Sequence, residues 1–260
     1  MNEELNEKAI EASMNKERSD PPPIPAKEPN QPQHPATSSR ADVEAFLDRV
    51  NALDPAVKAG ERGRLIFALD ATMSRQPTWD KACYLQAEMF REAAAAGGLD
   101  LQLVYYRGLA ECRASGWFTD PQRFGEVMSS IDCRSGETQI ARVLAHVRRE
   151  NDRRKVAALV FVGDAMEEML DEVCAGAGEL GLRSVPAFMF QEGDDPDCEQ
   201  AFREIARLSR GAYCRFAPGA AHELGELLRA AAAYAAGGMK ALATLRARST
   251  SASRLIEQMK

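Results

Sequence analysis

The sequence predicts an α/β protein with a doubly wound, mostly parallel sheet of about six strands, one antiparallel edge strand and helices on both faces. Two observations lead to this class. Short apolar runs alternate along the chain with segments of helical periodicity, which is the pattern of strand–helix units that build a parallel sheet. The two strongest runs, at 64–70 and 155–164, are also apolar almost throughout, as strands buried on both faces are.

The expected elements follow in chain order. Apolar residues at helical spacing predict an amphipathic helix over 42–53 that packs on the domain. The expected strands cover 64–70, 101–106, 109–117, 155–164, 184–190 and 212–216. The expected helices cover 79–96, 121–128, 138–149, 165–177, 198–209 and 221–236. The second and third strands flank Arg107-Gly108, so they form a short hairpin that supplies the antiparallel edge strand.

Composition divides the chain into three parts. Residues 1–40 are polar and hold seven prolines between positions 21 and 35, so they predict a disordered Pro-rich arm. The plain interpretation of this arm is a linker, and docking to a reader of Pro-rich ligands is left open. Residues 41–236 form the folded domain. Residues 237–260 follow a Gly-Gly break and predict a basic tail, either a frayed end or a short helix.

The net charge and the length of the apolar runs argue against nucleic-acid binding and against a membrane span. The 260 residues carry a formal net charge of −6, which disfavours sequence-independent binding to nucleic acid. No run approaches the roughly 18 apolar residues of a membrane span, so no membrane partner is expected. Six scattered cysteines with no CxxC motif indicate reduced thiols in a cytoplasmic protein.

Oxygen-bearing side chains follow the strongest strands. Asp70, Thr72 and Ser74 come directly after the first strand, and Asp164 follows the other strong strand. Thr138 opens the helix between them. Because ligands of open α/β sheets bind outside the carboxyl ends of the strands, these five side chains are expected to converge. Two carboxylates and three hydroxyls form an all-oxygen site that suits Mg²⁺ or Mn²⁺.

This set resembles the metal-ion-dependent adhesion site (MIDAS) of von Willebrand factor type A (VWA) domains. That site combines an Asp-x-Ser-x-Ser loop, a distant Thr and a further Asp after the fourth strand. Asp70 matches the first Asp, Thr72 and Ser74 the two hydroxyls, Thr138 the distant Thr, and Asp164 the final Asp. The chain departs from the pattern in three places: Thr replaces Ser at 72, Met73 replaces a frequent Gly, and "SGET" replaces Gly-Gly-Thr.

The resemblance implies binding and no catalysis. In the family, the metal keeps an open coordination position that an Asp or Glu side chain of a partner protein fills. Intracellular members often act as adaptors, some of them beside AAA+ ATPases. By analogy, the chain is expected to be a metal-dependent adaptor or scaffold module with a protein partner.

Two alternatives remain at this stage. A haloacid dehalogenase-like phosphohydrolase would use Asp70 as its nucleophile, but it would need a second carboxylate at position 72, where this chain has Thr. The plainest interpretation is that Thr72, Ser74 and Asp164 only cap the helices that follow them. Glu167 and Glu168 are expected in the solvated first turn of a helix, with a place at the rim of the metal site as the alternative.

Overall fold

The computed structural model describes most of the domain that the sequence predicts. The described residues are 41, 44, 45, 48, 62–73, 79, 80, 82–85, 91, 98–218 and 220–258. The Pro-rich arm at 1–40 and Ser74 of the expected site lie outside them, as do most of the two helices expected at 42–53 and 79–96.

Six strands form one sheet in the order β3-β2-β1-β4-β5-β6. All neighbouring pairs are parallel except β2 and β3, which form the antiparallel hairpin. The strands are β1 (Gly63–Asp70), β2 (Leu99–Arg107), β3 (Glu111–Phe118), β4 (Ala158–Gly163), β5 (Ala187–Glu192) and β6 (Ala212–Phe216). This arrangement confirms the predicted fold class and places the ends of β1 and β4 side by side.

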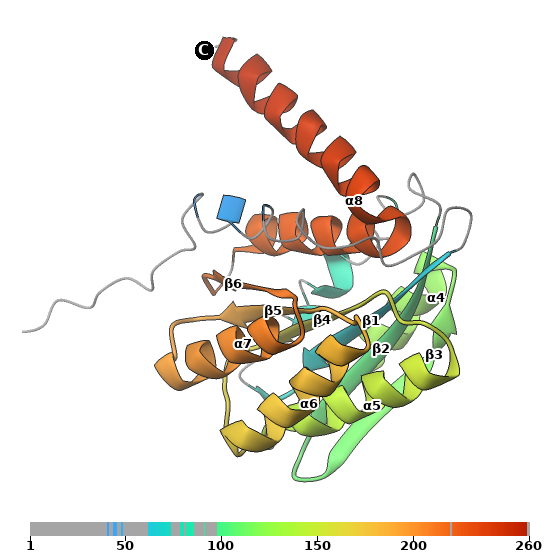
Figure 1. Ribbon diagram of the computed structural model, residues 1–260, viewed down its shortest axis with the longest axis vertical. Coiled ribbons are helices and arrows are strands. Elements are labelled where there is room, and N and C mark those ends of the chain that lie inside the picture. The colour runs from blue at the N-terminus through green and yellow to red at the C-terminus, as the bar shows by residue number, and fades with distance from the viewer. Residues whose placement is uncertain are drawn as a thin grey trace, which may run out of the picture. The chain divides into compact units, whose positions relative to one another are not determined.

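Helices cover both faces of the sheet (Figure 1). One core forms between the sheet and α5 (Ile140–Arg153), α6 (Leu170–Leu182) and α7 (Pro196–Leu208). The other forms between the opposite face and α4 (Pro121–Ser129), α8 (Ala221–Gln258) and the helical residues near Trp79. Every residue of β1 and β4 is buried, because these central strands contribute side chains to both cores.

Several helix boundaries differ from the sequence-based prediction, and three of the differences bear on the expected site or on the carboxyl-terminal tail. α5 begins at Ile140, so Thr138 lies two residues before the helix and not in its first turn. α6 begins at Leu170, and the predicted start at Ala165 was wrong because Glu167 and Glu168 bind elsewhere. α8 does not end before the Gly-Gly pair. Its backbone turns at Gly238, where φ is 61° and ψ is −153°, and then resumes as a helix to Gln258.

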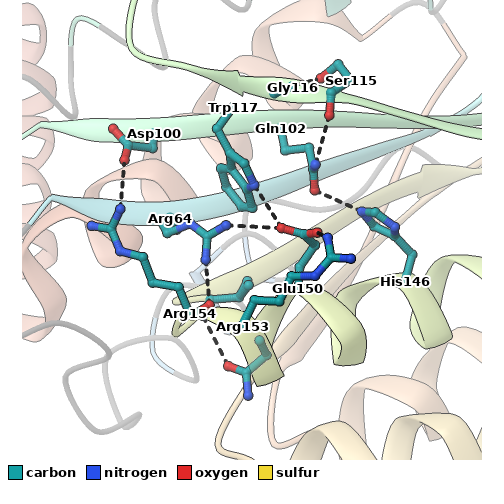
Figure 2. Close-up of polar contacts among 12 residues, drawn as sticks. Arg64, Asp100, Gln102, Ser115, Gly116, Trp117, His146, Glu150, Arg153 and Arg154 are labelled. Atoms are coloured by element: carbon teal, nitrogen blue, oxygen red, sulfur yellow. Dashed lines mark hydrogen bonds and ion pairs between the residues drawn. The ribbon is translucent and has the colours of Figure 1, made fainter.

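A buried polar network joins the amino ends of the strands to the last turn of α5 (Figure 2). Arg64 on β1 and Glu150 on α5 form an ion pair at 3.1 Å, and both side chains are buried. Glu150 also accepts hydrogen bonds from the indole of Trp117 at 2.9 Å and from Arg153 at 2.7 Å. The Arg64 guanidinium lies 3.7 Å from the centre of the Trp117 ring. Each charge in this network therefore has close partners, as buried charges require.

No helix among the described residues is both long enough and apolar enough to span a bilayer. The six cysteines are free thiols, three of them buried and three half-buried. Burial raises the pKa of the Cys83 thiol to about 11.

Candidate metal site at the carboxyl edge of the sheet

Asp70 is the last residue of β1, and its side chain is almost completely buried. Its Oδ1 accepts a hydrogen bond of 2.8 Å from the backbone N–H of Thr72, which bends the chain away from the sheet. Met73 follows with an exposed side chain, and Ser74 lies outside the described residues. The structure therefore places Asp70 and Thr72 at the expected strand end.

The loop at 130–139 lies across the ends of β1 and β2. Its Arg134 N–H donates to the carbonyl of Ala71 at 2.9 Å, and its Glu137 N–H donates to the carbonyl of Gly108 at 3.2 Å. Gly136 packs directly on Gly108, where a β-carbon on Gly136 would lie only 2.2 Å from a backbone nitrogen. Because only glycine allows this approach, the "SGET" sequence holds the loop against the β2–β3 turn.

Thr138 is joined to the loop that follows β4. Its backbone N–H donates to the Glu167 carboxylate at 2.9 Å, and its hydroxyl accepts from the Glu167 N–H at 3.0 Å. This loop begins with Asp164, which is half-buried. Since β1 and β4 pair up to Leu69 and Val162, Asp164 follows β4 on the same edge as Asp70. The structure thus brings Asp70, Thr72, Thr138 and Asp164 to one edge of the sheet.

Glu168 caps the amino end of α5, a role that the sequence-based interpretation missed. Its carboxylate accepts from the N–H of Ala141 at 2.9 Å and from the N–H of Ile140. The sequence does contain one signal for this contact, because α5 begins without a residue that caps its amino end. Gln139 at the N-cap position makes no side-chain cap, so the first N–H groups need an acceptor from elsewhere. The expected solvated helical turn at Glu167 and Glu168 was therefore wrong.

Tyr106 is a second residue that the sequence did not single out. It lies opposite Asp70 in the β1–β2 register, and its fully buried hydroxyl forms no hydrogen bond of ordinary geometry with the described residues. Burial raises its pKa well above the usual value. The adjacent Asp70 carboxylate raises it further through its charge and through a contact that falls outside ordinary hydrogen-bond geometry, and the charges of Glu168 and Asp164 add to this. Carboxylates from three segments therefore act electrostatically on one buried phenol.

These residues fit a hard divalent cation. An ion held by Asp70 and Asp164 would neutralise both carboxylates, and its water ligands would offer the Tyr106 hydroxyl a polar partner. No group of three or more His, Cys, Asp or Glu side chains arranged to hold a metal occurs among the described residues. A MIDAS-type site does not require one, because hydroxyls supply its other ligands.

Solved structures with the same fold include VWA domains. An aerotolerance-related membrane protein from Bacteroides fragilis matches with a TM-score of 0.50 and 16% identity, over 65% of this chain and 98% of that one. The SpRpn10 VWA domain matches with a TM-score of 0.50 and 12% identity, over 68% and 98%. The pilus adhesin SpaC from Lactobacillus rhamnosus GG matches with a TM-score of 0.52 and 10% identity, over 69% of this chain and 30% of SpaC.

Sequence comparison adds no closer assignment, since no family model and no curated protein matches this chain. At identities this low, the likeness establishes the fold alone. Strand order, the antiparallel edge strand and the flanking helices all agree with it. The chain therefore has the Rossmann-like fold of VWA domains.

Proposed function

We propose that this chain is a protein-binding module whose bound Mg²⁺ or Mn²⁺ accepts a carboxylate from a partner protein. The ion is held by Asp70, Thr72, Ser74, Thr138 and Asp164, some of them through water. The observation that carries the proposal is the junction of three loops at one sheet edge. It combines the two aspartates that follow the adjacent strands β1 and β4 with Thr138, which is bonded to the loop of the second aspartate.

Formal charge explains why such a site would take a carboxylate. Two aspartates balance the two charges of the ion, and the hydroxyl ligands add none, so the ion still attracts a further anionic oxygen. Asp and Glu are the protein side chains that supply one. The partner therefore presents an acidic residue. A partner such as an AAA+ ATPase follows only from analogy with the VWA family.

Exposed apolar side chains at the same edge support a protein partner. Met73, Leu109 and Met169 are 57%, 76% and 73% exposed. They lie in the segments that follow β1, β2 and β4, whose carboxyl ends meet at this edge. Large exposed apolar side chains on the same edge as a polar site are typical of a surface that another protein covers.

We propose no catalytic role. Position 72, where a phosphohydrolase would need a general acid, carries a hydroxyl, and its backbone N–H is bonded to the Asp70 carboxylate at 2.8 Å. Assay with a generic phosphate ester tests this point. Metal-dependent turnover that Asp70→Asn abolishes would make the phosphohydrolase the better assignment.

Calorimetric titration with Mg²⁺ and Mn²⁺ tests the metal site. The double variant Asp70→Asn/Asp164→Asn should lose binding, because asparagine keeps the shape and the acceptor for Thr72 N–H but removes the charge. Asp152→Asn, on the exposed side of α5, is the matched control and should bind as wild type does. Equal binding by the double variant and wild type would refute the site.

Partner capture tests the rest of the proposal. Proteins retained by the wild-type chain in Mg²⁺ should be released by EDTA and should not be retained by Asp70→Asn. Substitution of the partner's acidic residue by its amide should have the same effect. A partner whose capture is indifferent to EDTA and to Asp70→Asn would show that the metal does not bridge the two proteins.

A further inference from the structure

A second candidate site lies away from the metal edge, between the edge strand β3 and helix α5. It is a cavity of about 190 Å³. Three arginines and one histidine line it, together with small or apolar residues, and no lining residue is acidic. The charged lining residues are Arg113 on β3 and Arg142, His146 and Arg149 on α5. The cavity is therefore lined by positive charge, although the protein as a whole has a net charge of −6.

The positions on α5 explain how the cationic lining arises. Arg142, His146 and Arg149 are spaced by four and three residues, so they share one face of the helix. Both arginines also act on the half-buried thiol of Cys112. Burial raises the pKa of this thiol, the positive charges of Arg142 and Arg149 lower it, and the more weakly acting charge of Glu168 raises it. The two guanidinium groups therefore lie near the same point in the cavity.

The arginines of α5 keep their charge available. Arg142 donates to the carbonyl of Ala110 at 2.7 Å and to the side-chain oxygen of Gln139 at 3.0 Å, and both acceptors are neutral. Neither Arg142 nor Arg149 forms an ion pair within the part of the chain that the structure describes. Arg113 binds Glu111 through Nε at 2.8 Å.

The nearby carboxylates are bound to other groups. Glu111 is shared between Arg113 and Arg107, which it binds at 3.1 Å. Glu150 is held by the Arg64 network, and Glu168 accepts from the first N–H groups of α5. No carboxylate of the described residues therefore lines the cavity, and the carboxylates closest to it already have donors of their own.

His146 completes the lining in a fixed tautomer. The amide nitrogen of Gln102 donates to the carbonyl of Ser115 at 2.8 Å, which leaves the Gln102 oxygen as the acceptor for His146 Nε2 at 2.9 Å (Figure 2). The histidine therefore carries its proton on Nε2 when neutral. Its ring is held in place and adds polar surface to the cavity.

We propose that this cavity binds a phosphate dianion, either free or as the head of a phosphorylated side chain. Arginine presents several N–H donors in a planar fork that matches phosphate oxygens, and several arginines at one point favour a doubly charged group. The volume of about 190 Å³ is below the roughly 300 Å³ at which pockets for whole small molecules begin. Only the phosphoryl group therefore enters, and whatever carries it stays outside.

Calorimetry on the full chain at constant ionic strength tests this site. The ligands are inorganic phosphate, a short phosphoserine peptide, its unphosphorylated form, and acetate. We expect binding of phosphate or of the phosphopeptide, and about tenfold or weaker binding by Arg142→Gln/Arg149→Gln. Arg149→Gln alone, which removes no hydrogen bond among the described residues, should weaken binding in the same direction. Arg123→Gln/Arg203→Gln removes two charges from α4 and α7 and should change nothing.

Each outcome decides the proposal. Tighter binding of the phosphopeptide than of phosphate supports a phosphorylated partner, and equal binding supports the free anion. Acetate binding as tight as that of phosphate would overturn the phosphoryl assignment. Absence of binding of both phosphate and the phosphopeptide in wild type, or equal weakening in the control variant, would overturn the site itself. Melting temperatures of all variants establish that each one is folded.

Discussion

The two ends of the strands, called here the amino edge and the carboxyl edge of the sheet, differ in how their buried charges are arranged. At the amino edge, Arg64 and Glu150 are buried together, and the acid accepts three hydrogen bonds from side chains. At the carboxyl edge, Asp70 and Asp164 add negative charge around the phenol of Tyr106, which has no ordinary hydrogen bond to a described residue. A satisfied ion pair maintains a fold, whereas gathered like charges are typical of a site that binds something.

This comparison predicts which measurement responds to each change. Substitutions at the amino edge should lower stability and leave metal affinity alone. Substitutions at the carboxyl edge should alter metal affinity. Their effects on the free energy of unfolding should be smaller than those at the amino edge, and some should be stabilising.

Glu150→Ala should cause the largest loss of stability. It leaves the buried Arg64 guanidinium without its carboxylate and removes the acceptor of the Trp117 indole, so unfolding free energy should fall by about 3–5 kcal/mol. Denaturant titration measures this loss. Glu179→Ala removes the carboxylate of the more exposed Arg148–Glu179 pair and should cost less than about 1 kcal/mol. Similar losses in the two variants would show that the network does not stabilise the amino edge.

Gly136→Ala should weaken Mg²⁺ binding by about tenfold, which corresponds to about 1.4 kcal/mol. Its β-carbon would meet the backbone of Gly108 at 2.2 Å, so the loop that leads to Thr138 must move. Gly116→Ala is the matched control on β3, where an added β-carbon would have no neighbour within 4 Å. Metal titration of both variants gives the result, and unchanged affinity in Gly136→Ala would mean that this loop does not position a ligand.

Tyr106→Phe should raise the stability of the metal-free protein by about 1 kcal/mol. It removes a buried hydroxyl that forms no ordinary hydrogen bond to a described residue and keeps the ring that stacks on Phe161 at 6.1 Å. Tyr213→Phe should have the opposite sign, because the Tyr213 hydroxyl donates to Gln191 at 2.7 Å. Denaturant titration in EDTA compares the two. Loss of stability in Tyr106→Phe would show that the phenol is satisfied.

The same contrast explains what could be predicted from the sequence. The strands at the centre of the sheet are continuous apolar runs, so local composition was enough to identify β1 and β4. Asp70 and Asp164 were found because they end those runs. Thr138 was singled out because it was expected to open the helix between them, and the structure brings it to the loop of Asp164.

The rest depends on contacts between distant segments. Residues 165–169 have helical propensity, but Glu167 and Glu168 bind the start of α5 about 28 residues away, and these bonds keep the segment out of α6. Tyr106 is an ordinary strand residue in sequence, and its role appears only when β2 lies beside Asp70. The glycine pair does interrupt α8, because Gly238 has non-helical φ and ψ, but the sequence left open whether the tail beyond it would be helical, as it is.

The smallest expected effect is a pH dependence at the amino side of the sheet, where His146 adjoins the network. Burial lowers the pKa of His146 below its ordinary value near 6.5, Glu150 opposes this shift, and Arg149 and Arg153 add to it. A histidine with a lowered pKa binds a proton less readily in the folded than in the unfolded chain. Its contribution to stability is therefore complete above pH 6.5 and is lost as the pH falls toward the lowered value.

His146→Gln should remove part of this pH dependence. Glutamine can still donate to the Gln102 oxygen but cannot take up a proton between pH 7 and 5, so the loss of stability over that range should become smaller by a fraction of a kcal/mol. Melting temperatures across this range, with His222→Gln as the control for loss of a histidine elsewhere, measure the difference. An unchanged pH profile in His146→Gln would mean that the network tolerates a charged imidazolium. The amino ends of the strands would then accommodate an additional charge without loss of stability, although the hydrogen bonds of the network pair every charge that is now buried there.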